Sequence, residues 1–293
     1  MRLFFFCTFV FFQTTLFAKI YDCFTFLNEL ELLQVRFEEL YDVVDHFVIV
    51  EATQTFSGNP KPLYFSENVH LFEKYKDKII CIVVNDFPSA TDDPEKDRWI
   101  REEFQRNAML RGLSACSDED IILVSDLDEI PNQRSIYEIL SFFKINGFYP
   151  RKNYSKPKDT VVRIENQFIC ELHMRLFVFY LNQESLGGWN GAVKAAPYWL
   201  VKKRLPWNLR ILHMYDRDLP KIYHAGCHFH AMGGRERVNY KLQSIDPAYK
   251  VDEFTKFTNQ GYNAILVPID SGYPKYIQEH IDDYVSMGWV HGP

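Results

Sequence analysis

The sequence has no basic tract, no internal repeat and no low-complexity segment. It carries 33 Lys and Arg against 39 Asp and Glu, which gives a net charge of −6 at pH 7. Proteins that bind nucleic acid need clustered positive charge to neutralise the phosphates. We therefore expect no nucleic-acid partner, and the absence of long linkers and repeats leaves one continuous folded unit.

Cysteine pairs with the spacing of a metal or redox motif are also absent. The chain has 6 Cys, and no two of them form a Cys-x-x-Cys motif. This excludes a zinc ribbon and a thioredoxin-like site. Cys7 lies in the N-terminal apolar segment, which leaves an odd number of cysteines, and a disulfide among them stays open. Cys23 and Cys81 lie in apolar runs, where we expect buried thiols.

The N-terminus has the pattern of a targeting segment. Arg2 precedes an apolar stretch over residues 3–17, and Ala18 offers a small residue for cleavage. The apolar stretch is short for a membrane span. We expect residues 1–18 to be a signal peptide that directs the protein into the secretory pathway, or to the periplasm or medium of a bacterium. Leu16 fits signal peptidase poorly, so an uncleaved segment that attaches the protein to a membrane is the alternative.

The rest of the chain, residues 19–293, predicts a single domain. Of the 293 residues 47% are hydrophobic, which is enough for a substantial core. Apolar runs predict strands over residues 20–26, 46–52, 79–84 and 121–126. Helical spacing predicts helices over residues 28–44, 67–78, 97–113 and 135–146. This alternation is typical of an α/β fold with a mainly parallel central sheet flanked by helices.

Residues 121–131 form the most informative segment. Four apolar residues lead into three acids, Asp126, Asp128 and Glu129, and Pro131 ends the strand. Three carboxylates beside a core strand repel one another and lose hydration. A divalent cation removes both costs, and carboxylate oxygens suit Mn²⁺ or Mg²⁺. The segment therefore predicts a metal site, and its alternative is a solvated turn after a strand.

An ordered series of motifs runs through residues 20–245. It consists of residues 28–40, 42–45, 47–51, Gly58, Pro60, Pro62, Leu63, 97–100, Arg106, 126–131, 173–175 and 225–228. In this order the motifs resemble glycosyltransferase family 17. The chain departs from the family at Cys227, where the family usually has Trp in Gly-Trp-His, which leaves the packing around His228 open.

The resemblance implies a fold of the GT-A type, which binds nucleotide sugars. It also implies a UDP-sugar donor, UDP-GlcNAc in the known member, and inversion at the anomeric carbon. The expected function is then metal-dependent transfer of a sugar, GlcNAc, to a glycan acceptor with a β linkage. Residues 19–150 would form the nucleotide-sugar-binding half, and residues 151–293, rich in Trp, Tyr, Gly and His, the acceptor-binding half.

Two residues are the expected metal ligands. Asp128 is expected to bind the ion directly. His228, which matches the family's His, is expected to be a further ligand of the same ion. Asp126 is expected to reach the ribose or a metal-bound water. His230 does not match the family, but on an extended strand it would face the same side as His228, so we expect a neighbour.

Two further residues are expected at the nucleotide. Arg106 is expected to contact phosphate or nucleotide, and its alternative is an ion-paired solvent face with Arg98 and Glu102, since the three are spaced four apart. Glu51, at the end of an expected strand, is expected to bind uracil or ribose, and its alternative is a capping carboxylate.

The second half offers candidates without a choice among them. Inversion needs a general base to take the acceptor proton. The candidates for this base are Glu165, Glu171, Glu184 and Asp216. Large aromatic side chains could stack on acceptor sugars, although most are core residues. The candidates for stacking are Trp189, Tyr198, Trp199 and Trp207.

Two other functions compete with transfer. A secreted metal-dependent phosphatase could also use Asp-x-Asp at a strand end, but such enzymes have Thr or Val where this chain has Ile130. An inactive carbohydrate-binding protein would keep the fold without the chemistry, and the intact acids speak against it.

Overall fold

The computed structural model describes residues 18–149, 164–216, 218–246, 248 and 263–292. The expected signal peptide lies outside these residues, apart from Ala18. Within the described ranges, no helix combines the length and the apolar character that crossing a membrane requires.

The first half of the chain alternates strands with helices. Its elements, with 3-10 helices labelled η, are β1 (Ile20–Phe26), α1 (Leu30–Leu40), β2 (His46–Ala52), α2 (Tyr64–Glu67), η1 (Val69–Tyr75), β3 (Ile79–Val84), α3 (Pro94–Asn107), η2 (Ala108–Leu113), β4 (Ile121–Asp126), β5 (Glu129–Pro131) and α4 (Gln133–Asn146). The four strands expected from the apolar runs have the bounds of β1 to β4. The helix expected over residues 67–78 is instead two short pieces, α2 and η1.

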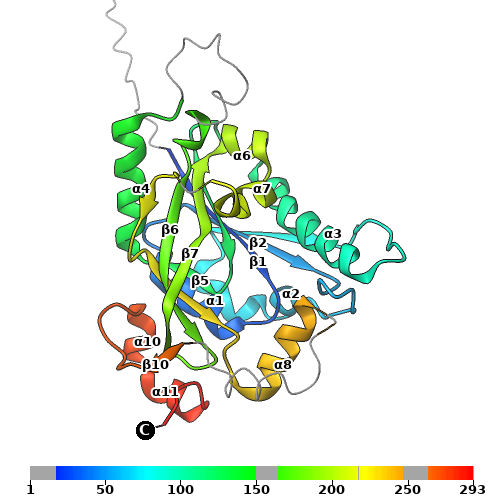
Figure 1. Cartoon of the computed structure of the whole chain (residues 1–293), viewed down its shortest axis with the longest axis vertical. Coiled ribbons are helices and arrows are strands. Elements are labelled where there is room, and N and C mark those ends of the chain that lie inside the picture. The colour runs from blue at the N-terminus through cyan, green and yellow to red at the C-terminus, as the bar shows by residue number, and fades with distance from the viewer. Residues whose placement is uncertain (1–17, 150–163, 217, 247, 249–262, 293) are drawn as a thin grey trace, which may run out of the picture.

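The second half is dominated by two long strands. Its elements are β6 (Cys170–Val178), β7 (Gln183–Pro197), α6 (Tyr198–Arg204), α7 (Pro206–Arg210), η3 (Leu212–Met214), β8 (Lys221–Ile222), β9 (Gly226–His230), α8 (Gly234–Ile245), β10 (Ala264–Leu266), α10 (Lys275–Glu279) and α11 (Ile281–Ser286). Figure 1 shows the β6–β7 pair in the centre, with α3 and α8 on one side of it in this view and α4 on the other.

One sheet joins the two halves. Its strand order is β3-β2-β1-β4-β7-β6-β9-β5, with β8 and β10 paired to β6 and β7. The first four strands in this order are parallel to one another, whereas β7 is antiparallel to both β4 and β6. This arrangement confirms the expected α/β fold with a central sheet flanked by helices. The parallel part is the first half, and the sheet is mixed beyond β4.

The parallel strands form the core because both of their faces are covered. Every residue of β1 is buried, as is the apolar run of β4. On α1, Phe37 packs its ring 4.7 Å from that of Phe47 on β2. Cys23 is buried as expected, but the expectation for Cys81 is wrong. Cys81 lies on β3, the edge strand, where its side chain is exposed.

The sheet brings the acids of the first half against the histidines of the second. β5 pairs antiparallel with β9, and this register puts Glu129 opposite His228. The approach is close at Gly226, whose φ is +145° and where an added Cβ would lie 2.1 Å from the Ile130 carbonyl oxygen. A glycine is therefore required at this position, since it has no Cβ and tolerates positive φ.

Candidate active site

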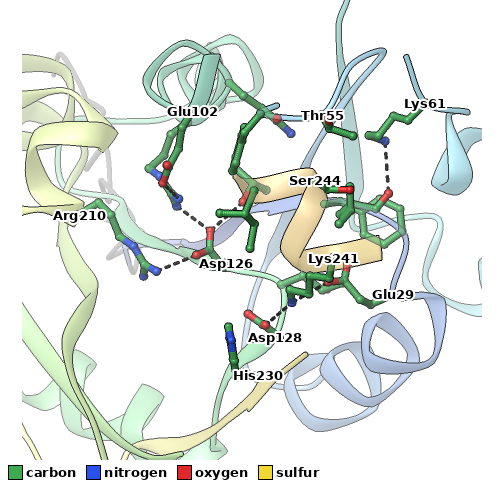
Figure 2. A pocket seen from close by; sticks show the side chains of 18 of the residues that line it. Glu29, Thr55, Lys61, Glu102, Asp126, Asp128, Arg210, His230, Lys241 and Ser244 are labelled. Carbon is green, nitrogen blue, oxygen red and sulfur yellow. Dashed lines mark hydrogen bonds and ion pairs between the residues drawn. The ribbon is translucent and has the colours of Figure 1, made fainter. Parts of the chain in front are cut away.

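A pocket of about 210 Å³ opens where the parallel strands end. Its walls come from the ends of β1 and β4, from α3 and α7, and from β9 and α8. Charged side chains converge on it from these separate elements, as Figure 2 shows for many of them. The charged and imidazole side chains in its lining are Glu29, Lys61, Glu102, Arg106, Asp126, Asp128, Arg210, His228, His230 and Lys241.

Asp126, the last residue of β4, is held between two guanidinium groups. Its Oδ1 accepts hydrogen bonds from Arg106 Nη1 and from the Thr25 hydroxyl, both at 2.8 Å, and its Oδ2 accepts one from Arg210 Nη2 at 2.7 Å. Burial raises the pKa of Asp126, but Arg106 and Arg210 outweigh it, so the pKa lies well below its usual range. The side chain keeps 31% of its surface exposed, which leaves it within reach of a ligand.

Asp128 lies two residues further on and has different partners. Lys241 Nζ on α8 lies 2.5 Å from Asp128 Oδ2 and 2.7 Å from Glu29 Oε1. Figure 2 shows Asp128 beside Lys241 and His230, away from the Arg210 side of the pocket. Burial alone would raise the pKa of Asp128, but Lys241 and His228 lower it well below its usual value. The ammonium group of Lys241 thus provides the positive charge that this buried carboxylate needs.

The described residues include one cluster that fits a metal ion. Asp128, His228 and His230 each offer a ligand atom, and these atoms lie within 4.8 Å of one another. His228 Nε2 lies 3.4 Å from Asp128 Oδ2, whereas its buried Nδ1 has no hydrogen-bond partner in the structure. Burial lowers the pKa of His230 to about 3, so this imidazole is neutral, as a metal ligand must be. One carboxylate and two imidazoles suit a divalent ion such as Mn²⁺.

Glu129 lies behind the pocket and orders two of its walls. Its side chain is fully buried. Oε1 accepts a hydrogen bond from Trp189 Nε1 at 2.5 Å, and Oε2 accepts bonds from Arg210 Nη1 at 2.6 Å and the Asp126 amide at 2.7 Å. Trp189 packs its ring 4.5 Å from that of His228. Glu129 therefore fixes a guanidinium and an indole around the histidine, while its own oxygens are fully used.

A buried arginine holds the Asp-x-Asp segment from the core side. Arg36 on α1 forms a two-bond pair with Asp22 on β1, at 2.7 and 2.6 Å. Its Nη1 donates at 2.9 Å to the carbonyl oxygens of Asp126, Leu127 and Glu129. One guanidinium thus satisfies three carbonyls of the turn that presents Asp128.

The remaining expected residues have separate positions. Arg106 lines the pocket, but it is fully buried and pairs with Asp126 and Glu102, so the alternative of a solvent face is wrong. Glu51 is absent from the described lining. Its carboxylate accepts hydrogen bonds from the Phe65 amide and from the Ser66 amide and hydroxyl, which places it at the start of α2. This is the position of a capping carboxylate, the alternative role.

The four candidate bases also lie away from the described lining of the pocket. Glu165 pairs with Lys203 and Arg204, and Glu184 pairs with Arg175. Asp216 accepts a hydrogen bond from Asn166 at 2.6 Å. Glu171 lies 2.6 Å from His173 Nε2. None of the four has a position relative to the pocket that identifies it as the general base.

Sequence reasoning missed Arg210, Lys241 and Glu29. The two cations lie on short or weakly patterned helices far along the chain, and neither belongs to a motif. The only signal was indirect: three clustered carboxylates require neighbouring positive charge, but the sequence does not reveal which Lys or Arg the fold brings to them.

The strand order defines an α/β protein whose strand-end acids face a cation-lined pocket. The sequence comparison is more specific. Residues 7–145 match the family model of glycosyltransferase family 17.

Curated relatives match part of the chain. A β-1,4-mannosyl-glycoprotein 4-β-N-acetylglucosaminyltransferase of Homo sapiens is 36% identical over 110 residues, which make up 36% of this chain and 20% of the relative. Its counterpart in Mus musculus is 34% identical over the same length. The match thus spans about a fifth of the length of these relatives. Among solved structures, a mannosyltransferase of Pyrobaculum calidifontis, in complex with GDP-Man and Mn²⁺, has a TM-score of 0.41 at 13% identity, covering 94% of this chain and 72% of that one.

Proposed function

We propose that this protein transfers a sugar from a UDP-sugar to a glycan acceptor, in a reaction that requires Mn²⁺ or Mg²⁺. The observation that carries the proposal is the cluster of Asp128, His228 and His230 at the end of β4, beside four cationic side chains that line the same pocket. The match of residues 7–145 to the model of glycosyltransferase family 17 supports the reaction class. The names of the relatives support GlcNAc as the sugar and a mannosyl-bearing glycan as the acceptor.

In this proposal Asp128 and His228 hold the ion, and His230 lies within reach of it. A bound divalent ion would neutralise the charge that develops on the diphosphate as it leaves. Lys241 Nζ lies 2.5 Å from Asp128 Oδ2, so an ion and the ammonium group compete for one carboxylate.

The cations of the pocket suit the remaining charge of the donor. Arg210 and Arg106 both lie against Asp126, which is partly exposed and can accept a hydrogen bond from a ribose hydroxyl. Their guanidinium groups present planar donors to phosphate oxygens. Lys61 adds an ammonium group at the opposite wall, 3.9 Å from Glu51.

Transfer with inversion needs only one displacement, in which a base takes the proton of the acceptor hydroxyl. No residue has to serve as a covalent nucleophile. The product would then be β-linked. The position of the acceptor hydroxyl decides which residue acts as the base.

The test is the release of UDP from a panel of nucleotide sugars, with Mn²⁺ and with a chelator. The proposal expects metal-dependent UDP release, with UDP-GlcNAc preferred over UDP-glucose, GDP-mannose and CMP-linked sugars. A large anomeric coupling in the proton NMR spectrum of the fresh product would identify the β linkage. Release of phosphate from simple esters would instead indicate a hydrolase. Release of neither UDP nor phosphate from any compound tested would indicate a binding protein.

A further inference from the structure

Two tryptophans meet outside the pocket, on two helices that both contribute to its wall. Trp99 on α3 keeps 44% of its surface exposed, and Trp207 on α7 is half-buried. Their ring centroids lie 6.0 Å apart, with the planes tilted by 54°. Single exposed apolar residues are common, but a pair of indoles from two separate helices offers a larger continuous aromatic surface.

This pair lies on two helices that also carry residues of the proposed active site, and we refer to the surface of the pair as the rim of that site. On α3, Glu102 and Arg106 follow Trp99 by three and seven residues, so all three lie on one face of the helix. On α7, Arg210 follows Trp207 by one turn. Glu102, Arg106 and Arg210 line the pocket. Each helix therefore directs a charged side chain into the pocket and presents a tryptophan one or two turns earlier.

Beside Trp99 the surface forms a shallow hollow of about 440 Å³. Its lining consists of Asp93, Glu95, Lys96, Trp99, Ile100 and Glu103. Carboxylate and ammonium groups around an aromatic ring are the chemistry that a sugar requires: the polar groups bond its hydroxyls, and the ring covers its apolar C–H face. A protein partner would require a larger apolar surface than this hollow provides.

The Trp99 ring is held in place before any ligand binds. The Arg98 guanidinium lies 4.2 Å from the ring centroid, and it is itself held 3.7 Å from Asp246 at the end of α8. This contact joins α3 to the helix that carries Lys241. A ring that is already fixed loses little conformational entropy when a ligand stacks on it.

We propose that Trp99, Trp207 and the adjoining hollow form a subsite for the carbohydrate chain of the acceptor. The proposal rests on the proposed transferase function, because the pocket that the subsite adjoins is the donor site. The donor's charged diphosphate belongs with the cations inside the pocket, whereas the rim offers an aromatic surface with hydroxyl-bonding groups. The sugar residues that extend away from the reacting hydroxyl are the part of the acceptor that fits this rim.

The first experiment measures glycan binding without catalysis. The probes are soluble β-linked oligosaccharides of mannose and N-acetylglucosamine, titrated by calorimetry against the full chain. Trp99→Ala and Trp207→Ala should each weaken the binding of the best probe by at least about fivefold, the effect of losing one aromatic stack. Trp99→Phe should recover part of the affinity. The control is Tyr149→Ala, which removes another aromatic residue with 44% exposure, stacked on Trp199 of α6. Equal binding by Trp99→Ala and Tyr149→Ala, or no binding by the native chain, overturns the subsite.

The second experiment separates this inference from the proposed function. In steady-state transfer, Trp99→Ala should raise the acceptor KM by a similar factor while the donor KM changes by less than about twofold. A rise in donor KM with unchanged acceptor KM would overturn the subsite and leave the transferase intact. If the native chain releases UDP from no nucleotide sugar but binds glycans through Trp99, the transferase proposal fails and the subsite stands.

Discussion

Two groups of buried charges contact the same Asp-x-Asp segment, one from the core and one from the pocket. On the core side, Arg36 and Asp22 are both fully buried and bond to each other, and Arg36 also donates to backbone carbonyls. On the pocket side, the carboxylates of Asp126 and Asp128 bond to side chains from several elements, among them the cations of α3, α7 and α8. We refer to Arg36 and Asp22 as the core pair, and to Asp126, Asp128 and their cationic partners as the pocket cluster.

The difference separates scaffold from site. The core pair has no solvent access, and the guanidinium of Arg36 donates to Asp22, to Ser125 and to the carbonyls of the turn, so the pair holds the turn in place. The pocket cluster contains a partly exposed carboxylate, a carboxylate shared with a lysine, and a histidine nitrogen without a partner. Partners of this kind can be exchanged for a ligand. We therefore expect changes in the core pair to reduce stability, and changes in the pocket cluster to reduce activity.

The largest effect should come from Arg36→Met. Removing the arginine leaves Asp22 as a buried charge without a partner, which costs about 3–5 kcal/mol of unfolding free energy. Urea denaturation of the native chain and the variant measures this loss. As a control, Arg36→Met combined with Asp22→Leu removes both charges and should recover part of the stability. A loss below about 1 kcal/mol in the single variant would contradict the assignment of Arg36 to the scaffold.

The next effect should be that of Asp128→Asn on activity. Loss of the expected metal ligand should lower kcat by roughly 100-fold or more, about 2.7 kcal/mol or more of transition-state stabilisation. The fold should survive, because the amide keeps the shape of the carboxylate and Lys241 keeps its pair with Glu29. UDP release and thermal unfolding measure the two effects together. Asp118→Asn, which removes an exposed pair with Lys202, is the matched control and should change neither. Full activity in the Asp128 variant, or in chelated native protein, rules out the metal.

A smaller effect is expected for His228→Ala on metal affinity. If His228 is a ligand, the variant should bind Mn²⁺ at least about tenfold more weakly, and His230→Ala should weaken binding less. Affinity for Mn²⁺ should also fall at acid pH, since a metal-bound imidazole must be neutral. Calorimetric titration with Mn²⁺ gives the order of the two variants. The reverse order would make His230 the ligand and His228 the neighbour.

The smallest effect is expected for Glu51→Gln. The amide keeps one acceptor oxygen for the start of α2 but loses the charge, so unfolding should become easier by about 1 kcal/mol. The donor KM should change by less than twofold, because Glu51 lies outside the described lining of the pocket. A rise in donor KM without loss of stability would assign Glu51 to nucleotide binding and contradict its assignment to the scaffold.

The fold followed from the sequence to the extent that its patterns are local. Four apolar runs predicted β1 to β4 with their bounds, because buried parallel strands need continuous hydrophobic residues. The helix at residues 67–78 was less well predicted, since α2 and η1 are short and depend on tertiary contacts. Cys81 was misplaced because an apolar run does not reveal whether its strand lies at the edge or in the middle of the sheet.

The site was predicted only where its residues are close in sequence or carried by a motif. Asp126 and Asp128 follow directly from the end of an apolar strand, and His228 from the family resemblance. Arg210 and Lys241 lie 84 and 113 residues away from the acids they bond to. No spacing rule links residues at such distances, so the cations of the pocket could not be named.

The sequence by itself therefore determined an α/β chain with a buried strand that ends in clustered acids, because these features depend on side-chain polarity and on a period of two or nearly four residues. The tertiary structure alone decided which charges neutralise those acids and which acids remain available. It made Glu129 a fully bonded support, Glu51 a helix cap and Asp128 a shared carboxylate. The physical reason is that the state of a buried carboxylate depends on the few donors within about 3 Å, and in this protein the fold gathers those donors from distant parts of the chain.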